Sequence, residues 1–546
     1  MATNKDNRPS DGAGMLGSIV GVLLLLYVAI YLAGALASAL PPYLLLAVLV
    51  GGIVVAGRWL AGGRGHGSLG GLFGAPRPLG GSARWAGLWD LSHAGWIGRG
   101  GAAGGWPIGV YHALGGLVPI TVRLPLAAQP QSVLIVAPNG AGKTDGPLVQ
   151  MARAEATIAD PAERHSAVLL DPKGDVLEKA RDALEQTHKI LIWDPSHPER
   201  STVAFDPLAW LPDVRDPWFQ AAGEAASSCF LAATQRMSRL PGSGGGQEGD
   251  YWLRNAQMFL TGVLLYRRAA GPITWLDIVR YLRERPLPDI GRDLLHNPGC
   301  TAIRIAGMSL KELLLNERAR GIVGNDILQR MMLLADPRLK TVLAPGKLPA
   351  FDLKSFLAHP TVLQLRIGAI NDPLAPLLSV VVATLSVELL RRAENGKPLP
   401  RGVRFFCDEV GVIGPIYTLD AAPAITRSAN IGWIIVAQTL AQLRTNYGRE
   451  AAETLLANLN HRIVLGGATD EDARWVCGNL GRQEAYRELP STNGRGEQSR
   501  HYAREEWPLL RPDQLRRMRF EAVVDSPHIP PLRVTLRRYD GKPWRR

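Results

Sequence analysis

The chain has 546 residues, of which 46% are hydrophobic and 20% charged, a composition that excludes an intrinsically disordered protein. Its 61 lysines and arginines outnumber its 49 aspartates and glutamates, and the resulting formal charge of +12 predicts an acidic partner. The four cysteines are widely spaced and form no CxxC pair, which argues against a disulfide framework and against a zinc knuckle.

The first feature along the chain is an uncharged stretch at 12–57. A helix that spans a bilayer needs roughly 20 such residues, so there is room for two. Pro41-Pro42 separates them, because proline lacks the N–H that a continuing helix would use. The sequence therefore predicts two transmembrane helices, 15–39 and 43–60, within an anchor at 1–62.

Basic residues flank this predicted anchor. Lys5 and Arg8 precede it and several arginines follow it, so the positive-inside rule predicts that both flanks are cytoplasmic. The protein would then be a multi-pass membrane protein with the bulk of its chain in the cytoplasm. A cleaved signal peptide is the alternative, because Ala37-Ser38-Ala39 has the small-x-small form of a cleavage site. The long apolar stretch before it, and the second one directly after it, favour the anchor.

Residues 63–130 are predicted to be a glycine-rich linker and the lead-in to the next domain. The glycine-rich part has too little apolar periodicity to form a domain of its own. Its arginines would also be able to contact anionic lipid.

An apolar β run at 133–137 leads into a loop that ends in Gly142-Lys143-Thr144. Strand, loop and helix in this order are typical of a Walker A motif. In that motif backbone N–H groups surround phosphate oxygens, the lysine binds the β/γ-phosphates and the threonine binds Mg²⁺. Ala137 replaces the first glycine of GxxxxGK[ST], which an alanine with negative φ is able to do. An ordinary glycine turn would not account for Gly-Lys-Thr.

The loop therefore predicts a site for ATP and Mg²⁺. Its predicted nucleotide-binding residues are Asn139, Gly140, Ala141, Gly142, Lys143 and Thr144. Lys143 is also predicted to act in catalysis, and Thr144 is also a predicted metal ligand.

A second apolar strand, 403–407, ends in Asp408-Glu409, which is a Walker B arrangement. Asp408 is predicted to hold Mg²⁺ and Glu409 to polarise the attacking water. Taken alone, Asp408 and Glu409 would be interpreted as carboxylates exposed to solvent at the end of a strand. The phosphate loop upstream favours an ATPase.

Three further β runs end in polar residues or glycines. They are 167–170 before Asp171-Pro172-Lys173-Gly174-Asp175, 431–436 before Gln438, and 462–465 before Gly466-Gly467. Residues past the carboxyl ends of parallel strands converge on the ligand crevice, so Gln438 is predicted to sense the γ-phosphate. Strands alternate with helices over 131–211 and 346–470, which predicts an α/β, RecA-like P-loop ATPase domain. Its two parts are 131–211 and 346–546, the second of which carries a basic C-terminal tail.

Helical periodicity replaces the strand pattern between these two parts. Leu253, Ala256, Leu260 and Val263 recur at spacings of three and four residues. An all-α subdomain inserted at 212–345 is therefore predicted. The alternative is that these helices continue the α/β domain.

Taken in order, these residues resemble the type IV coupling proteins, the membrane ATPases of conjugation and type IV secretion. The resemblance covers most of the chain and is carried by the following motifs: 137–144, Asp171-Pro172-Lys173-Gly174, Phe205-Asp206-Pro207-Leu208, Trp252, Asp408-Glu409, Arg427, Gln438-Thr439-Leu440-Ala441-Gln442-Leu443 and 532–539. Asp206 stands where the family leads us to expect asparagine.

This resemblance implies a homo-hexamer in the bacterial inner membrane that couples a relaxase-bound single DNA strand to a secretion channel and drives its transfer by ATP hydrolysis. The implied partners are DNA, the relaxosome, the channel proteins and the membrane. It also implies an arginine that acts catalytically across the subunit interface, and Arg427 occupies the corresponding place. Without the resemblance, Arg427 would be interpreted as a surface arginine.

Charge favours a nucleic-acid partner without identifying one. The last 36 residues hold ten basic and four acidic side chains, a net charge of +6. A solubilising or lipid-contacting tail would have the same composition. Two other functions stay open: a receptor for protein substrates of a type IV secretion system that pumps no DNA, and a septal-type translocase of double-stranded DNA.

Overall fold

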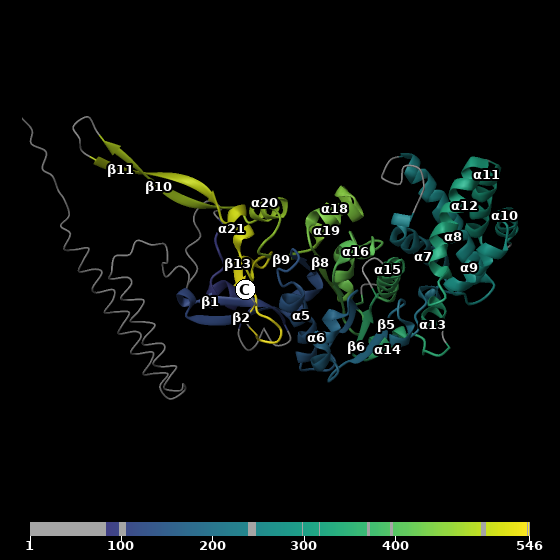
Figure 1. Ribbon diagram of the computed structural model, residues 1–546, viewed down its shortest axis with the longest axis horizontal. Helices are drawn as coiled ribbons and strands as arrows, with labels where there is room; N and C mark the ends of the chain where they lie inside the picture. The colour runs from purple at the N-terminus through teal and green to yellow at the C-terminus, as the bar shows by residue number, and fades with distance from the viewer. Residues whose placement is uncertain are drawn as a thin grey trace, which may run out of the picture. The chain divides into compact units, whose positions relative to one another are not determined.

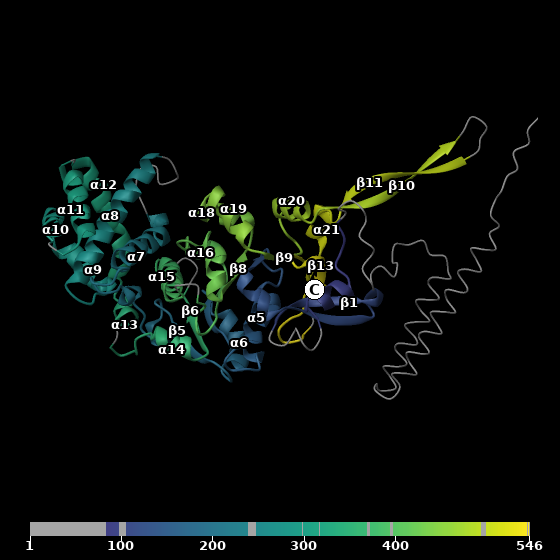
Figure 2. The ribbon, with the colours of Figure 1, turned by 180° about the vertical axis from the view of Figure 1, so that it is seen from behind.

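A computed structural model describes residues 83–97, 105–237, 247–297, 299–315, 317–344, 346–368, 372–393, 397–492, 498–542 and 544 (Figures 1 and 2). The chain divides into two compact units, Met1–Pro76 with His112–Val118, and Arg77–Tyr111 with Pro119–Arg546. The described part of the first unit is a turn that contains the 3₁₀ helix Leu114–Gly116. Apart from His112–Val118, the features below belong to the second unit.

Both predicted membrane spans lie outside the described residues, as does Ala37-Ser38-Ala39. Within the described ranges, every helix is too short or too polar to cross a bilayer.

A mixed β-sheet forms the centre of the second unit. Its eleven described strands follow the order β2-β1-β13-β12-β9-β3-β8-β7-β4-β6-β5. Seven of them are parallel: β9 (His461–Leu465), β3 (Val133–Val136), β8 (Ile431–Ala437), β7 (Val403–Cys407), β4 (Ser166–Leu170), β6 (Thr361–Leu365) and β5 (Lys189–Trp193). The sheet continues beyond β9 through β12 (Glu521–Ser526), β13 (Ile529–Thr535), β1 (Trp106–Ala113) and β2 (Val118–Leu124), and the pairings of β12, β13 and β1 are antiparallel.

The parallel strands are nearly continuous apolar runs because both faces of the sheet are covered. Along β3, Leu134 and Val136 join one hydrophobic cluster, whereas Val133 and Ile135 join the other. This alternation follows from the two-residue period of a strand.

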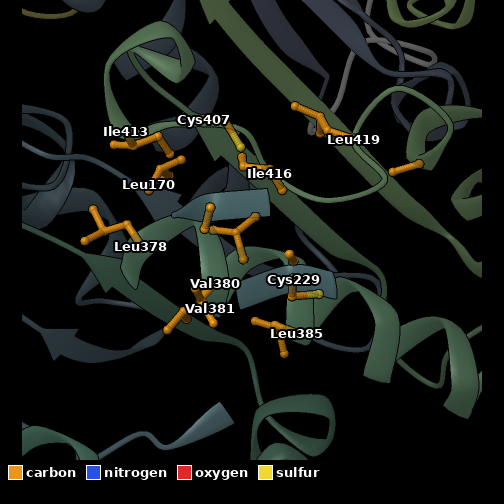
Figure 3. Packing of buried hydrophobic residues seen from close by; sticks show 14 of the residues in the cluster. Leu170, Cys229, Leu378, Val380, Val381, Leu385, Cys407, Ile413, Ile416 and Leu419 are labelled. Carbon is orange, nitrogen blue, oxygen red and sulfur yellow. The ribbon is translucent and has the colours of Figure 1, made fainter. Parts of the chain in front are cut away.

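Helices cover the two faces. The helices α5 (Val149–Ala154) and α6 (Asp175–Leu184) contribute to one cluster, and α15 (Pro376–Arg392), α18 (Leu440–Tyr447), α19 (Arg449–Asn458) and α20 (Asp470–Asn479) contribute to the other. Figure 3 shows part of the second cluster, which includes Leu170 and Cys407 from the sheet, Leu385 of α15 and Cys229. Shorter helices complete the fold: α4 (Leu88–His93), α14 (Leu353–Ala358), α16 (Val410–Ile413), α17 (Ala422–Thr426) and α21 (Pro512–Arg517).

The elements described within 212–345 are all helical. They are α7 (Phe219–Ala233), α8 (Gln247–Ala269), α9 (Trp275–Glu284), α10 (Leu287–Leu295), α11 (Thr301–Leu315), α12 (Glu317–Met332) and α13 (Leu339–Leu343), with short 3₁₀ turns between them. Phe230 of α7 packs on Trp275 of α9, with ring centroids 4.7 Å apart. The apolar cluster runs without interruption from these helices to the sheet, so both share one core.

Asp206 joins the sheet region to these helices. Its carboxylate accepts hydrogen bonds from the N–H groups of Leu208 at 2.8 Å and Trp275 at 2.9 Å. Burial raises the pKa of Asp206 to about 7. Asp206, which stands where the family leads us to expect asparagine, is therefore buried and binds the backbone of two separate segments of the chain.

Two features were missed by the sequence analysis. Residues 63–130, interpreted as linker and lead-in, contain α4, β1 and β2. A separate two-stranded ribbon, β10 (Arg482–Thr492) with β11 (Gln498–Pro508), pairs in register from Arg482↔Pro508 to Thr492↔Gln498. β1 joins the sheet by pairing Val110 with Thr535, a partner so distant in sequence that no local pattern reveals it.

Candidate nucleotide-binding site

The predicted site residues follow strands that are neighbours in the sheet. β8 lies between β3 and β7, and β4 lies on the other side of β7. Because these strands are parallel, the segments after their carboxyl ends meet at one edge. That edge carries the phosphate loop, Asp408-Glu409, Gln438 and 171–175.

The phosphate loop has the backbone that its glycines allow. Gly140 has φ +79° and Gly142 has φ +88°, a left-handed conformation that side chains with a Cβ rarely adopt. Ala137 still belongs to the strand pairing, since its N–H donates to the carbonyl of Ala437 at 3.0 Å. Ala137 is not among the described residues with positive φ, so this position does not require glycine. Thr144 then begins a π-helical turn that leads into α5.

Lys143 reaches the acidic pair although 266 positions separate it from Glu409. Its buried Nζ lies 3.4 Å from Glu409 Oε1 and 4.0 Å from Asp408 Oδ1. The fold therefore brings together the lysine and both carboxylates of the two predicted motifs. An ammonium group placed there offsets the repulsion between the carboxylates.

Asp408 is suited to hold a cation. It is 7% exposed, and its Oδ1 atom has no hydrogen-bond partner among the described residues. Burial raises the pKa of Asp408 to about 6, against the opposing attraction of Lys143. A buried carboxylate oxygen that accepts no hydrogen bond is a favourable ligand for Mg²⁺, because this cation prefers carboxylate and hydroxyl oxygens.

Glu409 sits in a strained backbone conformation. Its φ of 54° and ψ of 42° are left-handed, and its Oε2 atom has no hydrogen-bond partner among the described residues. Burial raises its pKa, but the hydrogen bond from Lys173 and the charge of Lys143 outweigh this, so the pKa of Glu409 lies below its usual value. Glu409 is therefore a carboxylate at neutral pH, as a base requires.

Lys173 is a residue of this site that the sequence analysis did not assign. Its Nζ lies 2.7 Å from Glu409 Oε1, and this hydrogen bond raises the pKa of Lys173. It follows β4 in Asp171-Pro172-Lys173-Gly174, where Asp171 accepts hydrogen bonds from the N–H groups of Gly174 and Val176 and so holds the turn. Its position after a parallel strand was the signal that could have identified it.

Gln438 lies at the same edge, directly after β8. Its side-chain oxygen accepts a hydrogen bond of 3.4 Å from Gln442 Nε2, and Thr439 caps α18 through Gln442 N–H at 3.2 Å. Because β8 lies between β3 and β7, Gln438 follows a strand that stands between those leading into the phosphate loop and the acidic pair.

Arg427 lies elsewhere. It starts the 3₁₀ turn Arg427–Ala429 before the amino end of β8, whereas Gln438 follows the carboxyl end. Seven strand residues separate the two ends, a span on the order of 20 Å. Arg427 is exposed, and the adjacent Thr426 is held by a hydrogen bond from buried Trp433 at 3.1 Å. The structure does not bring Arg427 to the site of its own chain.

The buried carboxylate of Asp408 makes the free energy of unfolding depend on pH. Its folded pKa of about 6 exceeds the ordinary value of 3.8, so protonation favours the folded state and this stabilisation is lost as pH rises through about 6. We expect Asp408→Asn to be more stable than the parent at pH 7.5, by up to about 3 kcal/mol, and to keep only roughly half of this advantage at pH 5, because the unfolded carboxyl is still ionised there. Thermal unfolding without nucleotide or divalent cation measures the difference.

Asp250→Asn, at an exposed position of α8, is the matched control and should change stability by less than about 0.5 kcal/mol at either pH. An Asp408→Asn variant as stable as the parent at both pH values would contradict the expected cost of the buried charge.

Comparison with known proteins identifies similar chains. The model of the family described as "Type IV secretory system Conjugative DNA transfer" matches residues 84–539. Protein VirD4 of Agrobacterium fabrum is 26% identical over 503 residues, which cover 84% of this chain and 65% of that protein. The chain thus spans slightly less than two thirds of the length of this relative.

Solved structures give the same picture of the fold. The unbound bacterial conjugative coupling protein TrwBdeltaN70 matches with a TM-score of 0.59 and 19% identity, covering 84% of this chain and 93% of that one. The plasmid coupling protein TrwB in complex with ADP and Mg²⁺ matches with a TM-score of 0.57 and 18% identity, covering 86% and 94%. Together with the parallel strands of the sheet, this confirms the RecA-like α/β fold predicted from the sequence.

Proposed function

The chain belongs to the type IV secretory system conjugative DNA transfer family, and we propose that it is an ATPase that drives DNA transfer. It couples a relaxase-bound single strand of DNA to a type IV secretion channel and uses ATP hydrolysis to move it. The convergence of Lys143, Asp408 and Glu409 at one edge of the sheet is the observation that carries this proposal.

The nucleotide's phosphates lie in the loop formed by Asn139, Gly140, Ala141, Gly142, Lys143 and Thr144. Backbone N–H groups and the Lys143 ammonium hold them, as in other phosphate loops. Thr144 and Asp408 hold Mg²⁺, which when bound offsets the charge of the phosphates. The TrwB structure in complex with ADP and Mg²⁺ supports the choice of a nucleotide and Mg²⁺ as the molecules bound here.

Hydrolysis uses side chains of two subunits. Glu409 orients and deprotonates the attacking water, and Lys173 and Lys143 hold its carboxylate in place. Gln438 senses the γ-phosphate. Arg427, which lies at the opposite end of β8 from Gln438, acts on the site of a neighbouring subunit in a homo-hexameric ring.

The remaining parts of the chain serve this motor. Residues 1–62 anchor it in the inner membrane through two helices, and 63–130 lead to the ATPase domain, whose parts are 131–211 and 346–546. The helical subdomain at 212–345 faces the relaxosome, the DNA and the channel proteins. Charge supports this assignment, since 1–57 are neutral and the chain's net charge of +12 falls on the remainder.

The test is ATP hydrolysis by the purified full chain in detergent, with and without single-stranded DNA. We expect single-stranded DNA to raise the turnover several-fold, and this stimulation to weaken as salt increases, because phosphate contacts release counterions. Lys143→Ala is the control for a contaminating ATPase. Stimulation by double-stranded DNA alone would favour a septal-type translocase, and ATP turnover indifferent to any DNA would favour a receptor for protein substrates.

A further inference from the structure

The last described residues of the chain, 536–542 and Trp544, lie against the phosphate loop, and we call them the C-terminal strap. A Cβ atom built on Gly142 would lie 2.5 Å from Cη2 of Trp544, and one built on Gly146 would lie 3.7 Å from Cζ2 of the same ring. The half-buried indole therefore fills the space beside both glycines. Any side chain at position 142 would collide with it.

Polar contacts fasten the strap to the residues that follow the loop. The N–H of Tyr539 donates to the carbonyl of Asp145 at 2.9 Å, and Arg538 lies 3.7 Å from the Asp145 carboxylate. Gln150 Nε2 donates to the carbonyl of Arg537. The strap thus contacts both the backbone and the side chains of the turn that begins the helix after Thr144.

The ring of Trp544 has a fixed orientation. It stacks on Phe520 with centroids 4.8 Å apart and an angle of 6° between the planes. Its Nε1 donates to the carbonyl of Leu536 at 3.0 Å, and the guanidinium of Arg538 lies 5.5 Å from its centroid. Stacking, a hydrogen bond and a nearby cation therefore fix the ring of Trp544, which gives the phosphate loop a rigid neighbour.

We propose that Trp544 is a positioning residue of the nucleotide site, and that the C-terminal strap holds the phosphate loop in its binding conformation before nucleotide arrives. This inference rests on the proposed function. Glycines have many accessible conformations, so an unsupported loop at Gly140 and Gly142 would lose entropy when phosphate orders it. A loop that is already ordered binds more tightly because this cost is smaller. The strap therefore acts on nucleotide affinity, not on bond cleavage.

The experiment compares nucleotide binding by the full chain and by its variants. Trp544→Ala is expected to raise the Kd for ADP with Mg²⁺ about tenfold, measured by titration calorimetry, while kcat changes less than about twofold. Hydrogen exchange of the peptide 138–146 should become faster without nucleotide. Trp544→Phe is expected to restore the affinity, because a flat ring is still able to stack on Phe520.

Trp218→Ala is the matched control, since Trp218 is 43% exposed and precedes α7 in the helical segment. It should change neither Kd nor hydrogen exchange. If Trp544→Ala does not fold, Trp544→Leu, which keeps an apolar side chain without a flat ring, should show the same loss of affinity.

An unchanged Kd in the folded variants would overturn the proposal. A lower Kd would also overturn it, because the ring would then obstruct the site. Failure of the parent chain itself to bind ADP or ATP would instead reject the proposed function.

Discussion

Glu409→Gln is expected to bind ATP with Mg²⁺ as tightly as the parent and to hydrolyse it about 10²–10⁴ times more slowly. The carboxylate is needed to orient and deprotonate water, whereas the phosphates are held by the loop and by Lys143. The amide oxygen of glutamine still accepts a hydrogen bond from Lys173, which contacts the carboxylate at 2.7 Å in the parent. Equilibrium nucleotide binding and steady-state turnover, measured on the same preparation, separate the two effects.

Lys143→Ala provides the contrasting result, since it should lose both binding and turnover. The charge-matched control for Glu409→Gln is Glu453→Gln, at an exposed position of α19, which should leave turnover unchanged. Hydrolysis by Glu409→Gln at the parent rate would show that Glu409 is not the base.

Arg427→Ala is expected to lower turnover by roughly 10³-fold or more while ATP binding changes little. The reason is distance. Arg427 precedes the amino end of β8 and Gln438 follows its carboxyl end, so Arg427 stabilises the transferred phosphoryl group only if it belongs to a neighbouring subunit. Turnover per subunit should therefore rise with protein concentration in the parent. Mixing Arg427→Ala subunits with parent subunits should reduce activity more than in proportion.

Arg449→Ala is the control, because Arg449 is also an exposed arginine and begins α19. An exposed arginine with no role in catalysis changes stability by less than about 0.5 kcal/mol when removed. Parent-like turnover of Arg427→Ala at every protein concentration would reject the action across subunits and leave Arg427 as a surface residue.

The local parts of the site could be predicted from the amino-acid sequence. The phosphate loop was predictable because its chemistry needs adjacent residues: two glycines with left-handed backbone, then Lys143 and Thr144. The parallel strands were predictable for a similar reason, since a strand buried on both faces is a short apolar run. Family resemblance added a role for Arg427 that no local pattern contains, whereas the role of Gln438 was predicted from its place after a parallel strand.

Which residues distant in sequence come into contact became clear only from the folded chain. The contacts of Glu409 with Lys143 and Lys173 depend on the strand order β3-β8-β7-β4, which the apolar runs do not encode. The contact of Trp544 with Gly142 requires β12 and β13 to extend the sheet on the far side of β9, so that the chain returns to the loop. Local sequence specifies backbone conformation and burial, whereas pairing between distant strands is selected by the packing of the whole core.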